Sequence, residues 1–255
     1  MKNNNKLSLK ILAGIVSVVL IGGMLFITNS FVGNPISAMM ADKAIKEYVN
    51  QNYSSLDLEV EKAKFNFEVT GYMANVKSKT SIDTRFAIYY VGGMVQRDDY
   101  ENYVLGLYNT LDRFSTEYSA IAKNIVEKEL GYEDNMTNVL YDIDNYENNN
   151  DVLELDMKFD KALPLSPEVT IQLDITDYSI ESVAKVLTDA HKAFVDNGCI
   201  FYKYGFYDED KEKSIMVIGV TAADIENKNF IDLLKKADKE KNNTATEEGI
   251  AIFRK

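Results

Sequence analysis

One uncharged apolar run near the N-terminus constrains the fold of this chain more than any other feature. Residues Ile11 to Phe31 contain no charged side chain, and they follow a segment that carries Lys2, Lys6 and Lys10 but no acidic residue. As a helix, such a run extends about 30 Å at about 1.5 Å per residue, which matches the hydrocarbon thickness of a bilayer. The sequence therefore predicts a basic tail over residues 1–10 and a transmembrane helix over residues 11–31.

The flanks of this run predict how it is placed. Basic residues before it favour a cytoplasmic N-terminus, so the rest of the chain is expected to be extracytoplasmic and anchored in the cell membrane by a single pass. A signal-peptidase site needs small residues at two positions, and the nearest candidate, Ile36-Ser37-Ala38, has a bulky Ile at the first of them. We therefore expect an uncleaved signal anchor, with cleavage and secretion of the domain as the alternative.

Composition excludes several classes of function. The chain has 28 Lys and Arg against 40 Asp and Glu, for a formal charge of -12, and a protein this acidic is repelled by nucleic acids. One His and one Cys cannot supply a zinc site of His and Cys ligands, a Cys-x-x-Cys pair or an internal disulfide. Only carboxylate-based metal sites remain open, and no cofactor is expected.

Residues 36–98 have the pattern of a small α+β module. Asn34-Pro35 provides an N-cap followed by Pro at the first helical position, and apolar residues at helical spacing predict a helix over 36–52. Alternating apolar residues then predict a strand over 58–69 that changes parity once, which indicates a bulge. Two further strands, at 72–76 and 84–91, lead to Gly92-Gly93, a hairpin signal before a last strand at 94–97.

Residues 99–255 have the pattern of a second α+β module that opens with a long helix. Apolar residues from Val104 to Ile125 recur at spacings of three and four, and they predict a helix of about 28 residues that ends at Gly131. Further elements are predicted in this order: strands at 153–159 and 169–175, a helix at 179–197, strands at 199–207 and 213–220, helix to 239 and a closing strand at 249–253. The expected fold is α+β: a transmembrane helix followed by two modules of helices packed on antiparallel sheets.

The densest group of acidic residues lies in the Asn-rich segment 134–151. Asp142, Asp144 and Asp151 supply the carboxylate oxygens that hard cations such as calcium prefer. The spacing departs from that of known calcium loops, because Tyr146 stands where a third oxygen ligand is needed. These three residues are weak candidates for a metal site, and a solvated loop is the alternative.

No other residue fits a recognisable catalytic pattern, so no catalytic residue is predicted. His191 lies at the edge of the apolar face of a predicted helix, where a structural role is expected, and Cys199 opens an apolar strand, which predicts a buried thiol. Asp98 and Asp99 are neighbours on a strand, so their side chains point to opposite faces and cannot act on one substrate. No nucleotide-binding, zinc-protease or serine-hydrolase motif occurs.

Several short stretches resemble one known family. They are Gly33-Asn34-Pro35-Ile36-Ser37, Phe65-Asn66-Phe67, Gly71-Tyr72, Ser81-Ile82-Asp83-Thr84-Arg85-Phe86 and Arg97-Asp98-Asp99-Tyr100. On these residues the chain resembles the YfjL-like proteins of Gram-positive bacteria such as bacilli, most clearly over residues 1–110. The resemblance implies a small membrane-anchored protein with an N-terminal and a C-terminal α+β domain and no assigned activity. It supplies no catalytic residues.

Together these observations predict a membrane-anchored, extracytoplasmic binding or regulatory protein. Its sheet faces or its long helix would engage a peptide, a cell-wall component or a membrane partner. Two alternatives stay open. One is an enzyme acting on cell-wall material through Asp142, Asp144 and Asp151, which requires at least two of these carboxylates to converge in a cleft. The other is a homodimer zipped along Leu107–Ile125.

Overall fold

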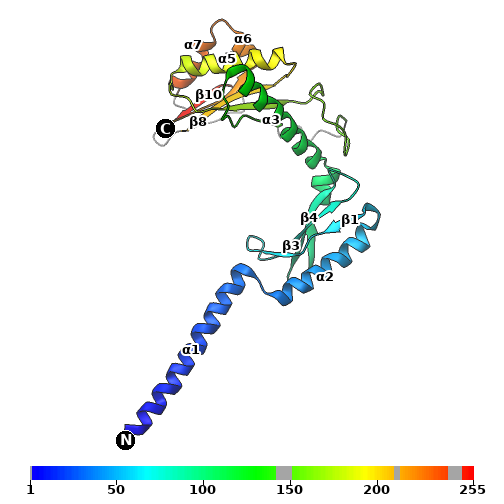
Figure 1. Cartoon of the computed structure of the whole chain (residues 1–255), viewed down its shortest axis with the longest axis vertical. Helices are drawn as coiled ribbons and strands as arrows, with labels where there is room; N and C mark the ends of the chain where they lie inside the picture. The colour runs from blue at the N-terminus through cyan, green and yellow to red at the C-terminus, as the bar shows by residue number, and fades with distance from the viewer. Residues whose placement is uncertain (1, 142–150, 210–212, 241–248) are drawn as a thin grey trace. The chain divides into compact units, whose positions relative to one another are not determined.

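The computed structural model describes residues 2–141, 151–209, 213–240 and 249–255. The chain divides into two compact units, Met1–Leu105 and Gly106–Lys255 (Figure 1). The sequence predicts that the second module starts at residue 99. The structure places residues 99–105 in the first unit, because Tyr100 and Val104 pack into the hydrophobic core of that unit.

The first unit begins with a helix, α1 (Lys2–Val32), drawn in blue in Figure 1. The hydrocarbon core of a bilayer requires about 20 consecutive, predominantly apolar residues in a spanning helix. Across residues 2–141, 151–209, 213–240 and 249–255, no helix is both long and apolar enough to cross a membrane. The predicted transmembrane helix over residues 11–31 is therefore wrong, and this part of the chain belongs to α1.

The helix α2 (Pro35–Asn52) begins where the sequence predicted. The side chain of Asn34 accepts a hydrogen bond from the backbone N of Ser37 at 2.8 Å, and Pro35 takes the first helical position. The Tyr72 hydroxyl fixes the chain before α2, since it accepts from the Asn34 N at 2.7 Å and donates to the Asn34 carbonyl at 2.9 Å. Gly33 has φ +72, and a Cβ there would lie 2.5 Å from that hydroxyl, so only glycine fits.

Five strands form the sheet of the first unit: β1 (Leu58–Val60), β2 (Lys64–Asn66), β3 (Gly71–Ser78), β4 (Arg85–Val91) and β5 (Met94–Asp98). Both β1 and β2 pair with β3, and β4 and β5 follow it, all antiparallel. Residues 61–63 interrupt the edge between β1 and β2, which accounts for the change of parity in the sequence. One face of the sheet buries Ala74, Val76 and Ile88 in a core shared with α2, while residues on the other face stay half-buried or exposed.

The second unit contains four helices and five strands among its described residues. They are α3 (Tyr108–Leu130), β6 (Asn138–Tyr141), β7 (Pro167–Gln172), α5 (Ile180–Asp196), β8 (Lys203–Glu209), β9 (Ser214–Thr221), α6 (Ala222–Glu226), α7 (Phe230–Lys239) and β10 (Ala251–Arg254). The sheet order is β10-β9-β8-β7-β6. β7 and β8 are parallel because α5 forms the crossover between them, so this sheet is mixed and not antiparallel as predicted.

A side chain of α3 hydrogen-bonds the backbone of the edge strand β6. The Ser119 hydroxyl accepts a hydrogen bond from the Val139 N at 2.7 Å and donates to the Val139 carbonyl at 3.3 Å. Both backbone groups that this residue turns away from the sheet are therefore satisfied. Such capping prevents an unpaired edge from adding a further strand at this point.

Two sequence predictions for the second module differ from the structure. The long helix begins only at Tyr108, because Leu107 has φ 59, a left-handed conformation that breaks the helix after the short turn Glu101–Leu105. Residues 153–159 are irregular and do not form a strand, with a turn at 155–156 where Asp156 has φ 62. The apolar side of α3, from Leu111 to Ile125, lies in the core of the second unit, and the alternative of a homodimer along Leu107–Ile125 stays a prediction.

Candidate functional site

The first unit has a groove of about 370 Å³ beside strands β2 and β3, which we call the sheet groove. It is lined by Glu61, Lys62, Lys64, Phe65, Asn66, Phe67, Glu68, Met73 and Asn75. The antiparallel pairing of Lys64 with Met73 places both strands along its floor. Phe67 is 66% exposed at the rim, so its ring is accessible from solvent.

Local hydrogen bonds hold the sheet groove in shape. The backbone N of Ala63 donates to the Asp42 carboxylate at 2.6 Å, and the N of Glu61 donates to the Asn75 carbonyl at 2.9 Å, so the bend between β1 and β2 is fixed at both ends. On the other side, the Asn66 side chain accepts from the N of Glu68 at 2.9 Å and sets the turn that carries Phe67. The groove is thus a preformed surface.

The lining of the sheet groove offers apolar, charged and amide groups to a ligand. It combines apolar Phe and Met side chains, two Lys, two Glu and two Asn amides. No Ser, Thr, Cys or His side chain is among these lining residues. The amide of Asn75 can donate and accept, as recognition of a peptide backbone requires, whereas the amide of Asn66 is already bonded to the Glu68 N and to Met73 Sδ.

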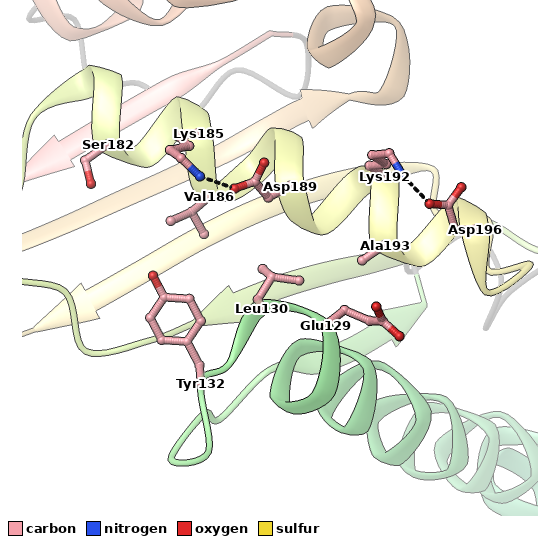
Figure 2. Close-up of a pocket in the computed structure, with 10 residues that line it drawn as sticks. All are labelled: Glu129, Leu130, Tyr132, Ser182, Lys185, Val186, Asp189, Lys192, Ala193 and Asp196. Atoms are coloured by element: carbon pink, nitrogen blue, oxygen red, sulfur yellow. Dashed lines mark hydrogen bonds and ion pairs between the residues drawn. The ribbon is translucent and has the colours of Figure 1, made fainter.

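The second unit has a groove of about 470 Å³ between the end of α3 and the helix α5, which we call the helix groove (Figure 2). It is lined by Glu129, Leu130, Tyr132, Ser182, Lys185, Val186, Asp189, Lys192, Ala193 and Asp196. In Figure 2, Val186 and Ala193 point from α5 toward the side that carries Leu130, while two ion pairs lie along α5. The helix groove therefore has a small apolar floor and a charged rim.

The charged groups of the helix groove are paired with one another. Lys185 pairs with Asp189, and Lys192 pairs with Asp196, each one helical turn apart. The hydrogen bond from each lysine to its aspartate raises the pKa of that lysine above its ordinary value. Both ammonium groups consequently keep their protons at neutral pH, so neither is a nucleophile or a general base.

His191 belongs to a buried polar contact outside both grooves. Its Nδ1 lies 2.8 Å from the Tyr204 hydroxyl on β8, and its Nε2 lies 3.3 Å from Glu226 on α6. Burial raises the pKa of Tyr204, so the hydroxyl stays protonated at neutral pH. The contact connects α5 with β8 and α6, which is a structural arrangement.

The neighbouring carboxylates Asp98 and Asp99 are both engaged by other side chains. Asp98 Oδ2 accepts hydrogen bonds from the hydroxyls of Tyr48 at 2.6 Å and Tyr53 at 2.7 Å, and burial is the main reason that the pKa of each tyrosine is raised. Asp99 pairs with Arg97 at 2.6 Å. The two carboxylates therefore have separate partners, which agrees with the inference that they do not share a substrate.

The candidate metal ligands are not brought together by the residues that the structure describes. Asp142 and Asp144 lie outside those residues, and Asp151 is exposed in a turn. Within residues 2–141, 151–209, 213–240 and 249–255, no group of three or more His, Cys, Asp or Glu side chains is placed to hold a metal ion. A metal site or a carboxylate-dependent active site that uses Asp142, Asp144 and Asp151 stays a prediction.

Sequence reasoning missed both grooves, although each left a signal. The change of strand parity at 61–63, next to Phe65-Asn66-Phe67, marks the sheet groove. The seven-residue recurrence of Lys and Asp along α5 marks the helix groove. Cys199, by contrast, is a buried free thiol as predicted, and burial raises its pKa.

Comparison with known proteins assigns the chain to a family. A model described as "YfjL-like, N-terminal domain" matches residues 8–101, and one described as "YfjL-like C-terminal domain" matches residues 117–235. Each match lies within one of the two structural units. No curated protein and no solved structure matches the chain. With both domains present in order, this chain belongs to the YfjL-like family.

Proposed function

We propose that this protein is a non-catalytic binding protein and that its first unit binds an extended polypeptide in the sheet groove. The observation that carries the proposal is Phe67, 66% exposed at the rim of a preformed groove beside an edge strand. An exposed aromatic ring next to an edge strand is a common anchor for a peptide that lies along a sheet.

The rest of the lining supports a polypeptide over other ligands. Lys62 and Lys64 are accompanied by Glu61 and Glu68, so the groove lacks the uniform positive charge that a nucleic acid requires. Apolar side chains and amides together match the alternating side chains and backbone of a peptide.

A peptide display library, selected against the full chain, tests this function. Phe67→Ser removes the aromatic anchor, and we expect the selected peptides to bind this variant at least about tenfold more weakly. Ile82→Ser is the matched control, because Ile82 is 67% exposed in the same unit but does not line the groove. Peptides that bind all three proteins equally, or a library that yields no binder, would contradict the proposal.

Two further expectations have their own tests. Turnover of any substrate by the purified chain in a broad hydrolase panel would show catalysis and would contradict a purely binding role. The predicted extracytoplasmic location stays a prediction. Accessibility of the second unit to protease added to intact cells would test it.

A further inference from the structure

The outer face of α5 carries four charged side chains in a regular order. Lys185, Asp189, Lys192 and Asp196 follow one another at spacings of four, three and four residues. Their side chains are 77%, 49%, 77% and 58% exposed, so all four are accessible from solvent. They cover about 17 Å of the helix at about 1.5 Å per residue.

This order has a particular symmetry. Read backwards along the helix, the spacings are the same and each positive charge is replaced by a negative one. A second helix of the same sequence, laid antiparallel, therefore places an aspartate opposite every lysine. Lys185 faces Asp196 of the second copy, and Asp189 faces Lys192 of the second copy, about a two-fold axis between residues 190 and 191. In a parallel arrangement in the same register, like charges would face each other.

We propose that two copies of this protein associate through α5, antiparallel about a two-fold axis, with the helix groove receiving the second copy. The interface would be isologous, the commonest type in symmetric dimers. It goes beyond the proposed function, because it involves the second unit and does not use the sheet groove.

The helix groove provides the room that this arrangement needs. Val186 and Ala193, on the side of α5 that faces the groove, are buried in the core of the second unit, so the accessible surface of α5 at the groove is that of its charged side chains. Each lysine exchanges its partner within the helix for an aspartate of the second copy, so no charge is left unpaired.

Charge complementation tests the inference on the full chain. The acidic variant carries Lys185→Glu and Lys192→Glu, and the basic variant carries Asp189→Lys and Asp196→Lys. Each variant places like charges opposite each other, so we expect its self-association, measured by analytical ultracentrifugation, to be at least about tenfold weaker than that of the unaltered chain. An equimolar mixture restores opposite charges, so it should form a heterodimer that co-purifies through a tag on either copy.

A matched variant controls for the change of net charge. Lys43→Glu with Lys46→Glu alters two exposed lysines of α2 by the same charge, and it should associate like the unaltered chain. Circular dichroism checks that each variant is folded, which is expected because every altered side chain is largely exposed. A monomeric unaltered chain at about 1 mM would overturn the inference. Equal association of all variants would also overturn it, since another surface, such as the exposed apolar side chains of α1, would then be responsible.

Discussion

Replacing Tyr204 with Phe tests the buried polar contact between β8 and α5. Tyr204 is 1% exposed, and its hydroxyl lies 2.8 Å from Nδ1 of His191. Nε2 of His191 faces the Glu226 carboxylate at 3.3 Å, and a carboxylate accepts, so the neutral form of the ring places its hydrogen on Nε2. Nδ1 is then the acceptor, and the Tyr204 hydroxyl, which burial keeps protonated by raising its pKa, donates a hydrogen bond to it. The substitution therefore removes a single donor and leaves Nδ1 unsatisfied.

The magnitude follows from the burial of this contact. A buried acceptor that loses its donor destabilises a protein by about 1–3 kcal/mol, and Phe fills the same ring volume, so no cavity adds to this value. We expect the free energy of unfolding of the second unit to fall by about 1–2 kcal/mol in urea denaturation. The ¹⁵N signals of the chain's one histidine should also change from the Nε2–H tautomer alone to a mixture of both.

The matched control is Tyr202→Phe. Tyr202 is 53% exposed and lies two residues before Tyr204, so loss of its hydroxyl should change the free energy of unfolding by less than about 0.5 kcal/mol. The reasoning fails if Tyr204→Phe leaves both the stability and the histidine tautomer unchanged, because the hydroxyl would then not be the donor to His191.

Three further changes have defined outcomes. Burial raises the pKa of Tyr118 and Tyr204 above the ordinary 10.0, so the unfolded chain loses these protons at a lower pH than the folded chain. The melting temperature should therefore fall as the pH rises above about 10, and this fall should be less steep in Tyr204→Phe. Ser119→Ala leaves two backbone groups of Val139 without their partner and should destabilise the second unit by about 1–3 kcal/mol in urea denaturation. Gly33→Ala forces a left-handed conformation and displaces Tyr72, and should lower the free energy of unfolding by about 1–2 kcal/mol, measured the same way.

The elements that the sequence predicted well are those with local signals. Asn34-Pro35 locates the start of α2, Gly92-Gly93 locates the β4–β5 turn, and Ser179 caps α5 as expected. Each signal depends on only a few adjacent residues, so it can be read from the sequence without knowledge of the rest of the fold.

The failures depend on contacts between distant residues. Residues 153–159 alternate like a strand, but Leu153 is buried and Met157 and Phe159 pack against the same core from irregular backbone. The parallel pairing of β7 with β8 is decided by α5 crossing between them, which no local pattern encodes. Both grooves arise from segments brought together by folding, so the sequence held only indirect signals of them.

Ionic strength offers a test of the α5 dimer that depends on how charge is distributed in the second unit. Residues 106–255 contain 17 Lys and Arg against 30 Asp and Glu, so two copies repel each other at long range. This repulsion acts over distances longer than the Debye length, which is about 10 Å at 0.1 M salt, so salt screens it strongly. Ion pairs in contact are screened less. Association through α5 should therefore strengthen as salt rises from about 0.01 M to 0.1 M and weaken again towards 1 M. An apolar interface would show no such decline, because screening does not weaken the burial of apolar surface and excluded salts strengthen it. Association that increases steadily with salt in sedimentation experiments would thus show that the charged face of α5 is not the interface.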